Sequence, residues 1–299
     1  MTDTGDAQPR GDRVSLVIPA FNEAEGISET LREATAVLTG MNLAEHEVIV
    51  VDDGSADATA EMAAATPGVR IVRHPRNRGY GRSLKTGIGA ARFETVFIAD
   101  ADLTYPLDAM PELLAEYRRG FDMVVGERTG DHYRESAIKA PMRALLRFMV
   151  EYTSGSAIPD VNSGLRVFDK KAVTAHFPRL SNGFSFTTSV TLAYLMTGRL
   201  VTWRPIPYRG RKGRTKVRLF RDSLRTLQYI VEAAVYYNPL KIFMLLAGLA
   251  LGGAVIGFVV SAVLHLTIGY ILGIAGILLA AQFFALGLLA VLLKQIMDK

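Results

Sequence analysis

The stretch TVFIADADLTYP, residues 95–106, joins an apolar run to two aspartates that lie one residue apart. The run TVFIA has the length and the β-branched content of a buried strand. Asp100 and Asp102 follow at the point where that strand would leave the core. Two carboxylates at this spacing repel each other unless a cation lies between them. The stretch therefore predicts a metal ion, a basic partner or an exposed loop at the carboxyl end of a strand.

Four more short β-branched runs, several of them continuously apolar, alternate with helix-compatible segments. The predicted strands cover 13–19, 47–51, 69–73, 95–99 and 122–126, and the predicted helices cover 26–39, 57–65, 81–92 and 108–119. Strands that alternate with helices are typical of a doubly wound α/β domain, with a mostly parallel sheet covered on both faces. Ligands of such a domain bind beyond the carboxyl ends of the strands.

Polar segments follow four of these strands at that edge. They are PAFNE (19–23), DDGS (52–55), DAD (100–102) and GERTG (126–130). One acidic turn is common, but a set of them at one edge predicts a binding site. The paired carboxylates suit a hard divalent cation that also binds substrate phosphates, and the edge has no histidine or cysteine for zinc. No GxGxxG or GKS/T loop follows the first strand, which argues against a dinucleotide site and a P-loop.

Composition narrows the class of protein further. The 299 residues carry a net charge of +5 and contain no cysteine, so a disulfide framework and a thiolate metal site are excluded. Residues 1–12 are polar and predict a disordered leader, with no visible signal peptide.

A basic belt precedes the apolar C-terminal part, with Asp222 as its one acidic residue: Arg204, Arg209, Arg211, Lys212, Arg214, Lys216, Arg218, Arg221 and Arg225. This belt suits an anionic headgroup or a phosphorylated lipid, and it equally fits the positive-inside bias of membrane proteins.

Two apolar stretches, 241–265 and 268–294, are each longer than the roughly 20 residues that cross a bilayer. Their interiors contain no Asp, Glu, Lys or Arg, and a link of a few residues predicts a transmembrane hairpin within residues 240–299. Lysines flank the pair at 241, 294 and 299, which predicts that both outer ends are cytoplasmic. Residues 218–239 predict an amphipathic juxtamembrane helix, either on the membrane surface or packed on the soluble domain.

Small residues recur along the first apolar stretch. Gly248, Gly252, Gly253 and Gly257 include spacings of four residues, which allow helices to approach closely. These small residues are compatible with a homo-oligomer that forms through the hairpins, but they do not establish one.

The polar segments belong to a longer series of motifs. In order, the series is IPAFNE, VVDDGSADAT, NRGYGRSLKTGIGAA, IADADLTYP, MVVGERTG, IPDVNSGLRVFD, GFSFTT and RKGRTKV, over residues 14–217. The series resembles the membrane-associated family 2 glycosyltransferases with a GT-A fold, and within them the polyprenyl-phosphate (dolichol-phosphate type) sugar synthases. The resemblance implies a cytoplasmic GT-A domain over residues 13–217 of an integral protein of the cytoplasmic membrane. It also implies inverting transfer of a hexose from a UDP- or GDP-sugar to a polyprenyl phosphate, for cell-envelope glycosylation.

The same resemblance implies roles for particular residues. Asp100, Ala101 and Asp102 match the DxD motif, which binds Mg²⁺ or Mn²⁺ and through it the donor diphosphate. The nucleotide sugar would also contact Pro19, Ala20, Phe21, Glu23, Asp52, Asp53, Arg78 and Lys85. The acceptor phosphate would contact Arg128, Arg143, Arg211 and Lys216. Asp160, Asp102 and Arg128 form the implied catalytic set, with Asp160 either a base or an orienting group.

One position departs from the family pattern. Thr104 stands where many relatives have a glutamine two residues after the second DxD aspartate. This departure predicts that a metal or diphosphate contact is missing or bridged by water.

Two other functions stay open at this point. The first is a family 2 transferase that extends a glycan or glycolipid hydroxyl, for which a QxxRW-like element is missing. The second is a non-catalytic, nucleotide-binding membrane adaptor, which the retained carboxylates Asp100, Asp102 and Asp160 argue against. No nucleic-acid partner is expected.

Overall fold

The computed structural model describes residues 10–130, 140–209 and 219–297 of the chain. The chain divides into two compact units, Met1–Leu227 and Gln228–Lys299. Because the division falls inside one long helix, Leu219–Tyr237, the predicted juxtamembrane segment belongs partly to each unit.

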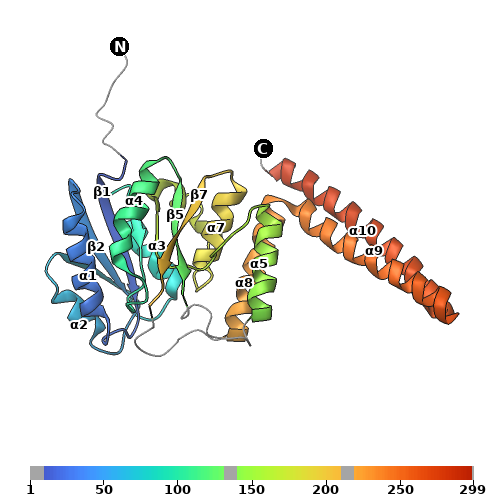
Figure 1. The fold of residues 1–299 in the computed structure, drawn as a ribbon, viewed down its shortest axis with the longest axis horizontal. Coiled ribbons are helices and arrows are strands. Elements are labelled where there is room, and N and C mark those ends of the chain that lie inside the picture. The colour runs from blue at the N-terminus through green and yellow to red at the C-terminus, as the bar shows by residue number, and fades with distance from the viewer. Residues whose placement is uncertain (1–9, 131–139, 210–218, 298–299) are drawn as a thin grey trace, which may run out of the picture. The chain divides into compact units, whose positions relative to one another are not determined.

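The first unit is an α/β domain built on one sheet (Figure 1). Its strands are β1 Arg13–Ala20, β2 Glu45–Asp52, β3 Val69–Arg73, β4 Thr95–Ile98, β5 Met123–Thr129, β6 Arg166–Asp169 and β7 Val201–Pro207. Its helices include α1 Ile27–Gly40, α2 Thr59–Ala64, α3 Tyr80–Ala90, α4 Met110–Arg118, α5 Ala140–Ser154, α6 Lys170–Thr174 and α7 Phe186–Met196, with short 3-10 turns η1 Leu107–Ala109 and η4 Phe177–Arg179. All the predicted strands and helices of residues 13–126 are present.

The sheet is mixed, with the strand order β3-β2-β1-β4-β6-β5-β7. β1 pairs in parallel with β2 and β4, β2 with β3, and β5 with β7. β6 is antiparallel to both of its neighbours, β4 and β5. The start of β6 therefore lies at the same edge as the carboxyl ends of the parallel strands, a consequence that the predicted mostly parallel sheet did not include.

Alternate residues of the central strands face different helices. Leu16 and Ile18 of β1 belong to the core cluster that also contains buried residues of α1 and α4. Val17, between them, faces α3, because a Cβ built on Gly87 of α3 would lie 2.3 Å from a Val17 methyl. Helices thus cover both faces of the sheet, as the continuously apolar strands predict.

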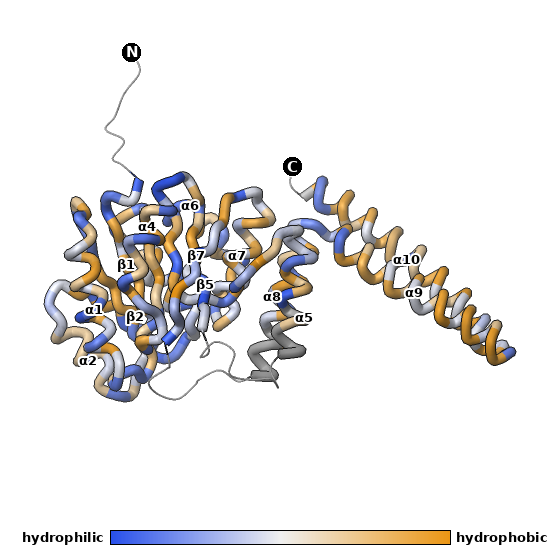
Figure 2. The backbone as a smooth tube through the Cα atoms, viewed as in Figure 1, coloured by the Kyte–Doolittle hydropathy of each residue, from blue (hydrophilic) through white to orange (hydrophobic). Residues whose placement is uncertain are grey.

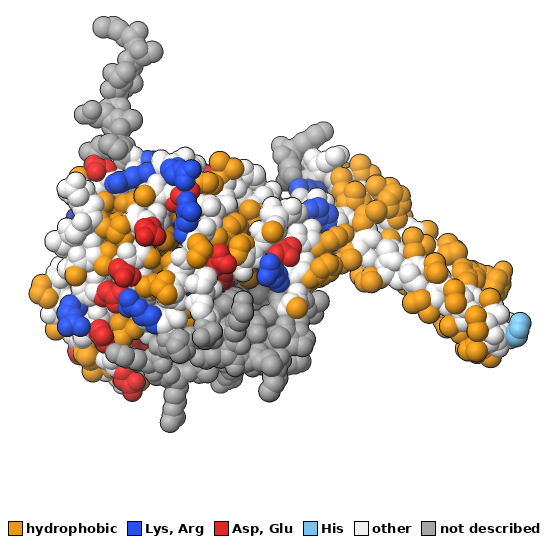
Figure 3. Space-filling model, viewed as in Figure 1, with side chains coloured by type: hydrophobic (Ala, Val, Ile, Leu, Met, Phe, Trp, Pro, Cys, Tyr) orange, Lys and Arg blue, Asp and Glu red, His pale blue; other side chains and the backbone are white. Residues whose placement is uncertain are grey.

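The second unit consists of the end of α8 (Leu219–Tyr237), α9 (Pro239–Leu264) and α10 (Thr267–Met297). The helices α9 and α10 form an antiparallel pair, and each is long and apolar enough to cross a membrane by length and composition. Hydrophobic residues run along both helices (Figure 2), and hydrophobic side chains cover most of the visible surface of the pair (Figure 3). Ile256 and Leu278, for example, are 65% and 66% exposed.

Glycines bring α9 and α10 together along one seam. A Cβ on Gly257 would lie 2.9 Å from the carbonyl oxygen of Gly269, so the two backbones nearly touch there. In contrast, a Cβ on Gly248, Gly252 or Gly253 would meet no described atom within 4 Å. Of the four small residues singled out in the sequence, Gly257 alone lies in the seam of this hairpin.

Candidate functional site

The candidate site lies at the edge of the sheet where β1, β2, β4 and β5 end. Ala20 and Asp52 are the last residues of β1 and β2 and are paired in register. Asp100 lies two residues after the end of β4, and Arg128 is the penultimate residue of β5. The segment 160–165 leads into β6 at the same edge, because β6 is antiparallel. Five segments far apart in sequence therefore meet at one edge.

Asp52 and Asp53 shape the first part of this edge. The buried Asp52 accepts hydrogen bonds from the backbone of Ser55 at 3.1 Å and from Arg73 Nε at 3.2 Å. His74, directly after β3, brings to this edge a histidine that the sequence did not predict, and its Nδ1 lies 2.6 Å from Asp53 Oδ1. The Asp53 carboxylate also accepts the backbone N–H groups of residues 78 and 79 at 2.9 and 2.8 Å. The Asp53 side chain thus holds the turn that leads into α3.

The PAFNE segment is tied to the loop after β2. Pro19 and Ala20 are buried at the end of β1, and Phe21 and Glu23 are half-buried. Asn22 has a φ of 51°, a conformation that asparagine tolerates better than most residues. Its side chain accepts the backbone N–H of Ala56 at 2.8 Å. Asn22 was not among the predicted site residues, although its place in PAFNE, before the DDGS loop, was a usable signal.

The DxD aspartates are each oriented by a hydroxyl group. Tyr80 donates to Asp100 Oδ1 at 2.8 Å. Thr104 donates to Asp102 Oδ1 twice, from its backbone at 3.2 Å and from its hydroxyl at 2.6 Å. The residue that departs from the family pattern therefore holds the second aspartate in place.

The backbone of the DxD turn is tightly enclosed. Leu103 has a φ of 62°, in the left-handed region that a branched side chain seldom adopts. A Cβ on Gly164 would lie 2.6 Å from Asp100 Oδ2, so a larger residue here would have to displace the carboxylate that Tyr80 holds. Among the residues that the structure describes, no three His, Cys, Asp or Glu side chains gather as a metal cage. Two carboxylates fit a hard cation that takes its remaining oxygen ligands from substrate and water.

Arg78 and Lys85 lie in and after the turn that Asp53 holds. The Arg78 side chain is exposed, and its backbone N–H is the group that contacts Asp53. The Lys85 ammonium group is buried and donates to the Leu180 carbonyl at 2.5 Å and to Asn182 Oδ1 at 2.8 Å. Burial lowers the pKa of Lys85. In this structure Lys85 braces the segment 180–182.

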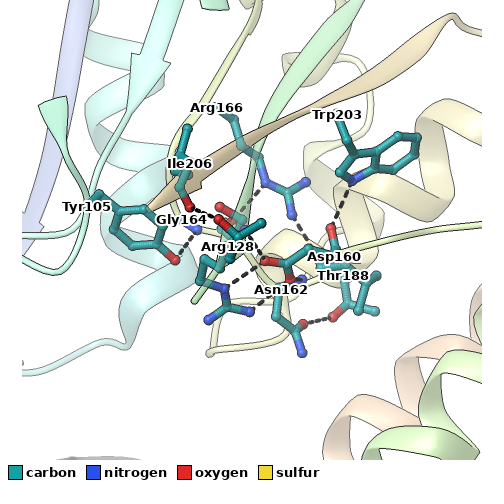
Figure 4. A network of polar contacts seen from close by, with 12 residues as sticks. Tyr105, Arg128, Asp160, Asn162, Gly164, Arg166, Thr188, Trp203 and Ile206 are labelled. Carbon is teal, nitrogen blue, oxygen red and sulfur yellow. Dashed lines mark hydrogen bonds and ion pairs between the residues drawn. The ribbon is translucent and has the colours of Figure 1, made fainter. Parts of the chain in front are cut away.

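The second half of the site is an ion pair between Arg128 and Asp160 (Figure 4). Arg128 donates to the Asp160 carboxylate from Nε at 2.7 Å, from Nη2 at 2.8 Å and from its backbone at 3.2 Å. The backbone of Asn162 adds a fourth hydrogen bond at 3.1 Å. Burial by itself would raise the pKa of Asp160, but the hydrogen bonds and charge of Arg128 outweigh it and lower that pKa. Asp160 is therefore an ionised, fully engaged carboxylate.

Two more residues fix the segment that carries Asp160. Trp203 of β7 donates its indole N–H to the Asp160 carbonyl at 2.9 Å. The fully buried Arg166 donates to the carbonyls of Ser163 and Val161, each at 2.8 Å, and to Thr191 Oγ1 at 2.6 Å. Burial lowers the pKa of Arg166 to about 10, which keeps it protonated at neutral pH. Arg166 thus braces the loop that carries Asp160.

Tyr105 and Tyr208 connect the two halves of the site. The Tyr105 hydroxyl accepts the backbone N–H of Gly164 at 2.7 Å, next to Asp100. The two tyrosine rings pack edge to face, 5.4 Å apart, and the Arg128 guanidinium lies 5.4 Å from the centre of the Tyr208 ring. Sequence reasoning missed both tyrosines, although the position of Tyr105 directly after the DxD turn was a signal.

Three predicted contacts to the acceptor phosphate have no described side chain. Arg211 and Lys216 lie outside the described residues. Arg143 falls within α5, where its backbone is described and its side chain is not. These assignments stay predictions.

This edge geometry on a mixed sheet of seven strands defines a GT-A domain, and solved structures support the fold. Glucosyl-3-phosphoglycerate synthase from Mycobacterium tuberculosis, crystallised with Mn²⁺, UDP and glucosyl-3-phosphoglycerate, is similar with a TM-score of 0.60 and 20% identity. The similarity covers 74% of this chain and 80% of that chain. The same enzyme has been crystallised with Mg²⁺ and UDP, with a TM-score of 0.59 at 19% identity over 74% of this chain and 79% of that one.

The family follows from the sequence comparison. The model of glycosyl transferase family 2 matches residues 15–177, and the chain belongs to this family. The undecaprenyl-phosphate 4-deoxy-4-formamido-L-arabinose transferase of Edwardsiella ictaluri (strain 93-146) is 27% identical over 294 residues, 92% of this chain and 87% of that protein. A protein of the same name from Pseudomonas fluorescens (strain SBW25) is 33% identical over 195 residues, 60% of this chain and 56% of that protein. The predicted fold, family and enzyme class are confirmed.

Proposed function

We propose that this glycosyltransferase moves one sugar from a nucleotide sugar to the phosphate of a polyprenyl phosphate, with inversion at the anomeric carbon. The names of the relatives support an undecaprenyl-phosphate acceptor. The apolar pair α9 and α10 supports a membrane location. The lysines at 241, 294 and 299 support a catalytic domain on the cytoplasmic side.

The state of Asp160 is the observation that carries the proposal. A hydroxyl acceptor must lose a proton during transfer, so its enzyme needs a general base whose pKa is matched to that task. Asp160 has a lowered pKa and accepts four N–H groups, which makes it a poor base. A phosphate acceptor is already ionised near neutral pH and needs no base. The site therefore favours a phosphate over a glycan or glycolipid hydroxyl.

The transfer step balances without a proton transfer. An oxygen of the acceptor phosphate forms a bond to the anomeric carbon, and the bond from that carbon to the donor diphosphate breaks. The electron pair leaves with the nucleoside diphosphate. Holding the two reactants in line is the main task of the protein, and such positioning can supply about 7–11 kcal/mol of a barrier. Asp160 serves as an orienting group for Arg128 in this scheme.

Each group of residues has a share in the positioning. Asp100 and Asp102 would hold Mg²⁺ or Mn²⁺, which would neutralise charge on the departing diphosphate. The segment 19–23, with Asp52 and the turn held by Asp53, would form the nucleoside pocket. Arg128 would meet the acceptor phosphate, together with the basic residues outside the described side chains.

The experiment uses the purified full-length chain in detergent with a divalent metal and a panel of labelled UDP- and GDP-sugars. Undecaprenyl phosphate and undecaprenol are the parallel acceptors. We expect label in the lipid phase with the phosphate alone, no product from Asp102→Asn, and full activity from Glu112→Gln, a control on the exposed face of α4. Label on undecaprenol would support a hydroxyl acceptor instead. No lipid product with any donor would favour an adaptor and overturn the proposal.

A further inference from the structure

Asn162 lies in the loop between Asp160 and β6, and both its backbone and its side chain are held. Its backbone N–H donates to Asp160 Oδ1 at 3.1 Å. Its side-chain oxygen accepts a hydrogen bond from Thr188 Oγ1 at 2.6 Å. Asn162 is nevertheless an exposed residue, in contrast to the buried Asp160 beside it. A polar side chain at the surface would ordinarily move among rotamers, and this one is fixed.

Thr188 is an unusual partner for this purpose. It is fully buried in α7, where threonine hydroxyls commonly donate to the carbonyl one turn earlier. Thr191 donates in that way to the Thr187 carbonyl at 2.8 Å, and Thr197 to the Ala193 carbonyl at 2.7 Å. The hydroxyl of Thr188 instead leaves its own helix and reaches Asn162. The hydrogen bond therefore links α7 to the loop that carries Asp160.

The bond from Thr188 decides which end of the Asn162 amide faces outward. Because the oxygen accepts from Thr188, the nitrogen with its two N–H donors is at the other end. Figure 4 shows this nitrogen pointing away from the network of polar contacts. Among the residues that the structure describes, none accepts a hydrogen bond from it. The loop thus presents an oriented, neutral donor to the space outside the network.

The neighbours of this donor indicate what it would bind. The guanidinium of Arg128 lies on the same side of the Asp160 carboxylate as the Asn162 amide (Figure 4). Asp160 accepts two hydrogen bonds from that guanidinium and balances its charge. An N–H donor held in place beside a cationic guanidinium suits an oxyanion, whose oxygens accept such hydrogen bonds.

We propose that the Asn162 amide nitrogen donates a hydrogen bond to the phosphate of the lipid acceptor, and that Thr188 is the residue that positions it. The proposal rests on the proposed function, because it names a further contact to the same acceptor. It adds a neutral contact that does not depend on the basic belt.

The test measures equilibrium binding of labelled undecaprenyl phosphate to the full-length chain in detergent micelles. Asn162→Asp is nearly isosteric, keeps an oxygen for Thr188, removes the N–H donors and adds a repulsive charge. We expect its Kd for undecaprenyl phosphate to rise about 100-fold or more, and that of Asn162→Ala about 10-fold, as for loss of a hydrogen bond to a charged group. Asn42→Asp makes the same change in an exposed loop between α1 and β2 and should leave the Kd unaltered.

Thr188 is tested by a second pair of variants. Thr188→Val keeps the shape and removes the hydroxyl, so the amide loses its orientation, and Thr188→Ser restores the hydroxyl. We expect the Kd for undecaprenyl phosphate to rise several-fold, about 3- to 10-fold, in the valine variant and to return to that of the wild type in the serine variant. The Kd for UDP with Mn²⁺ should stay within about twofold in every variant, which a general loss of folding would not allow.

The outcomes separate this inference from the proposed function. If the wild type binds no undecaprenyl phosphate, both fall together. If the wild type binds it and Asn162→Asp binds it equally well, the inference alone is overturned. A higher Kd for UDP-sugars with an unchanged Kd for the lipid would also overturn the inference, since the amide would then contact the sugar donor.

Discussion

The pair formed by Arg128 and Asp160 can be broken by one substitution, Arg128→Met, which keeps the apolar stem of the arginine. The variant removes the hydrogen bonds from Nε and Nη2 to the Asp160 carboxylate. It leaves two backbone N–H donors, at 3.2 and 3.1 Å. The Asp160 side chain is 1% exposed, so water cannot replace what is lost.

The expected cost follows from this burial. Removal of one partner from a buried ion pair destabilises a protein by about 3–5 kcal/mol, because the remaining charge is uncompensated. A loss of 1 kcal/mol lowers the Tm of a domain of this size by about 2–4 °C. We therefore expect the Tm of Arg128→Met to fall by about 6–20 °C near neutral pH. Arg13→Met breaks an exposed pair with Glu45, 41% and 52% exposed, and should cost at most about 1 kcal/mol.

The cost should depend on pH in a definite direction. The wild-type pKa of Asp160 is lowered, so its stabilising contribution is complete above the ordinary aspartate value and is lost as the pH falls through the lowered pKa. In Arg128→Met the same buried carboxyl has no cation, so burial raises its pKa above the ordinary value. Protonation then relieves the unpaired charge as the pH falls. The difference in Tm between the wild type and Arg128→Met should shrink from about pH 7.5 to about pH 5.

The assay is a fluorescence melt of the full-length chain in detergent. Trp203 is the only tryptophan, and its indole donates to the Asp160 carbonyl at 2.9 Å, so the signal comes from the site itself. A Tm for Arg128→Met within 2 °C of the wild type, or a difference that does not change with pH, would refute the reasoning.

Three further substitutions test other contacts of the structure. Thr104→Val removes the hydroxyl that orients the second DxD aspartate and should weaken Mn²⁺ binding in the presence of UDP about 10- to 100-fold. Electron paramagnetic resonance measures this affinity, and Thr104→Ser should stay near the wild type. Equal affinity in the valine variant would contradict the expectation. Gly164→Ala places a Cβ 2.6 Å from a DxD carboxylate oxygen and should abolish sugar transfer, whereas Gly89→Ala meets no described atom within 4 Å and should retain it. Gly257→Val should lower the Tm of the helix pair α9 and α10, and Gly248→Val, outside the seam, should not. The reverse order of the two effects would show that another seam holds the hairpin.

The parallel half of the fold could be predicted because the local sequence of each strand identifies it. β1, β2, β3 and β4 are short, rich in β-branched residues and separated by helical segments, and period and composition are enough to find them. The direction of β6 is not a local property. It depends on which strands it pairs with, and those partners, β4 and β5, are set by the tertiary structure.

The site could be predicted in its residue types but only partly in its contacts. The carboxylates Asp100 and Asp102 stand out because they follow a buried strand. That Arg128 bonds to Asp160, a residue 32 positions later, is a consequence of the antiparallel β6 and of its loop. The contacts of Lys85 could not be predicted either. Its ammonium group bonds to segment 180–182, and no sequence motif links Lys85 to that segment.

Residues that act by holding another side chain are the hardest to predict from sequence. Thr104, Tyr105 and Thr188 act through hydroxyl groups on partners that are fixed only after the chain has folded. A hydroxyl residue within an apolar segment carries no pattern that separates this role from ordinary packing. Thr104 illustrates the point, since in the sequence it stood out as a departure and in the structure it supports Asp102.

The mass of the lipid product tests the central claim most directly. The purified chain would be incubated with a divalent metal, its accepted nucleotide sugar and undecaprenyl phosphate, and the lipid phase analysed by mass spectrometry. Sugar transfer to the phosphate predicts a product heavier than the acceptor by one sugar residue, with a single phosphate retained. A product with two phosphates, or an unchanged lipid in the presence of every donor, would contradict the account.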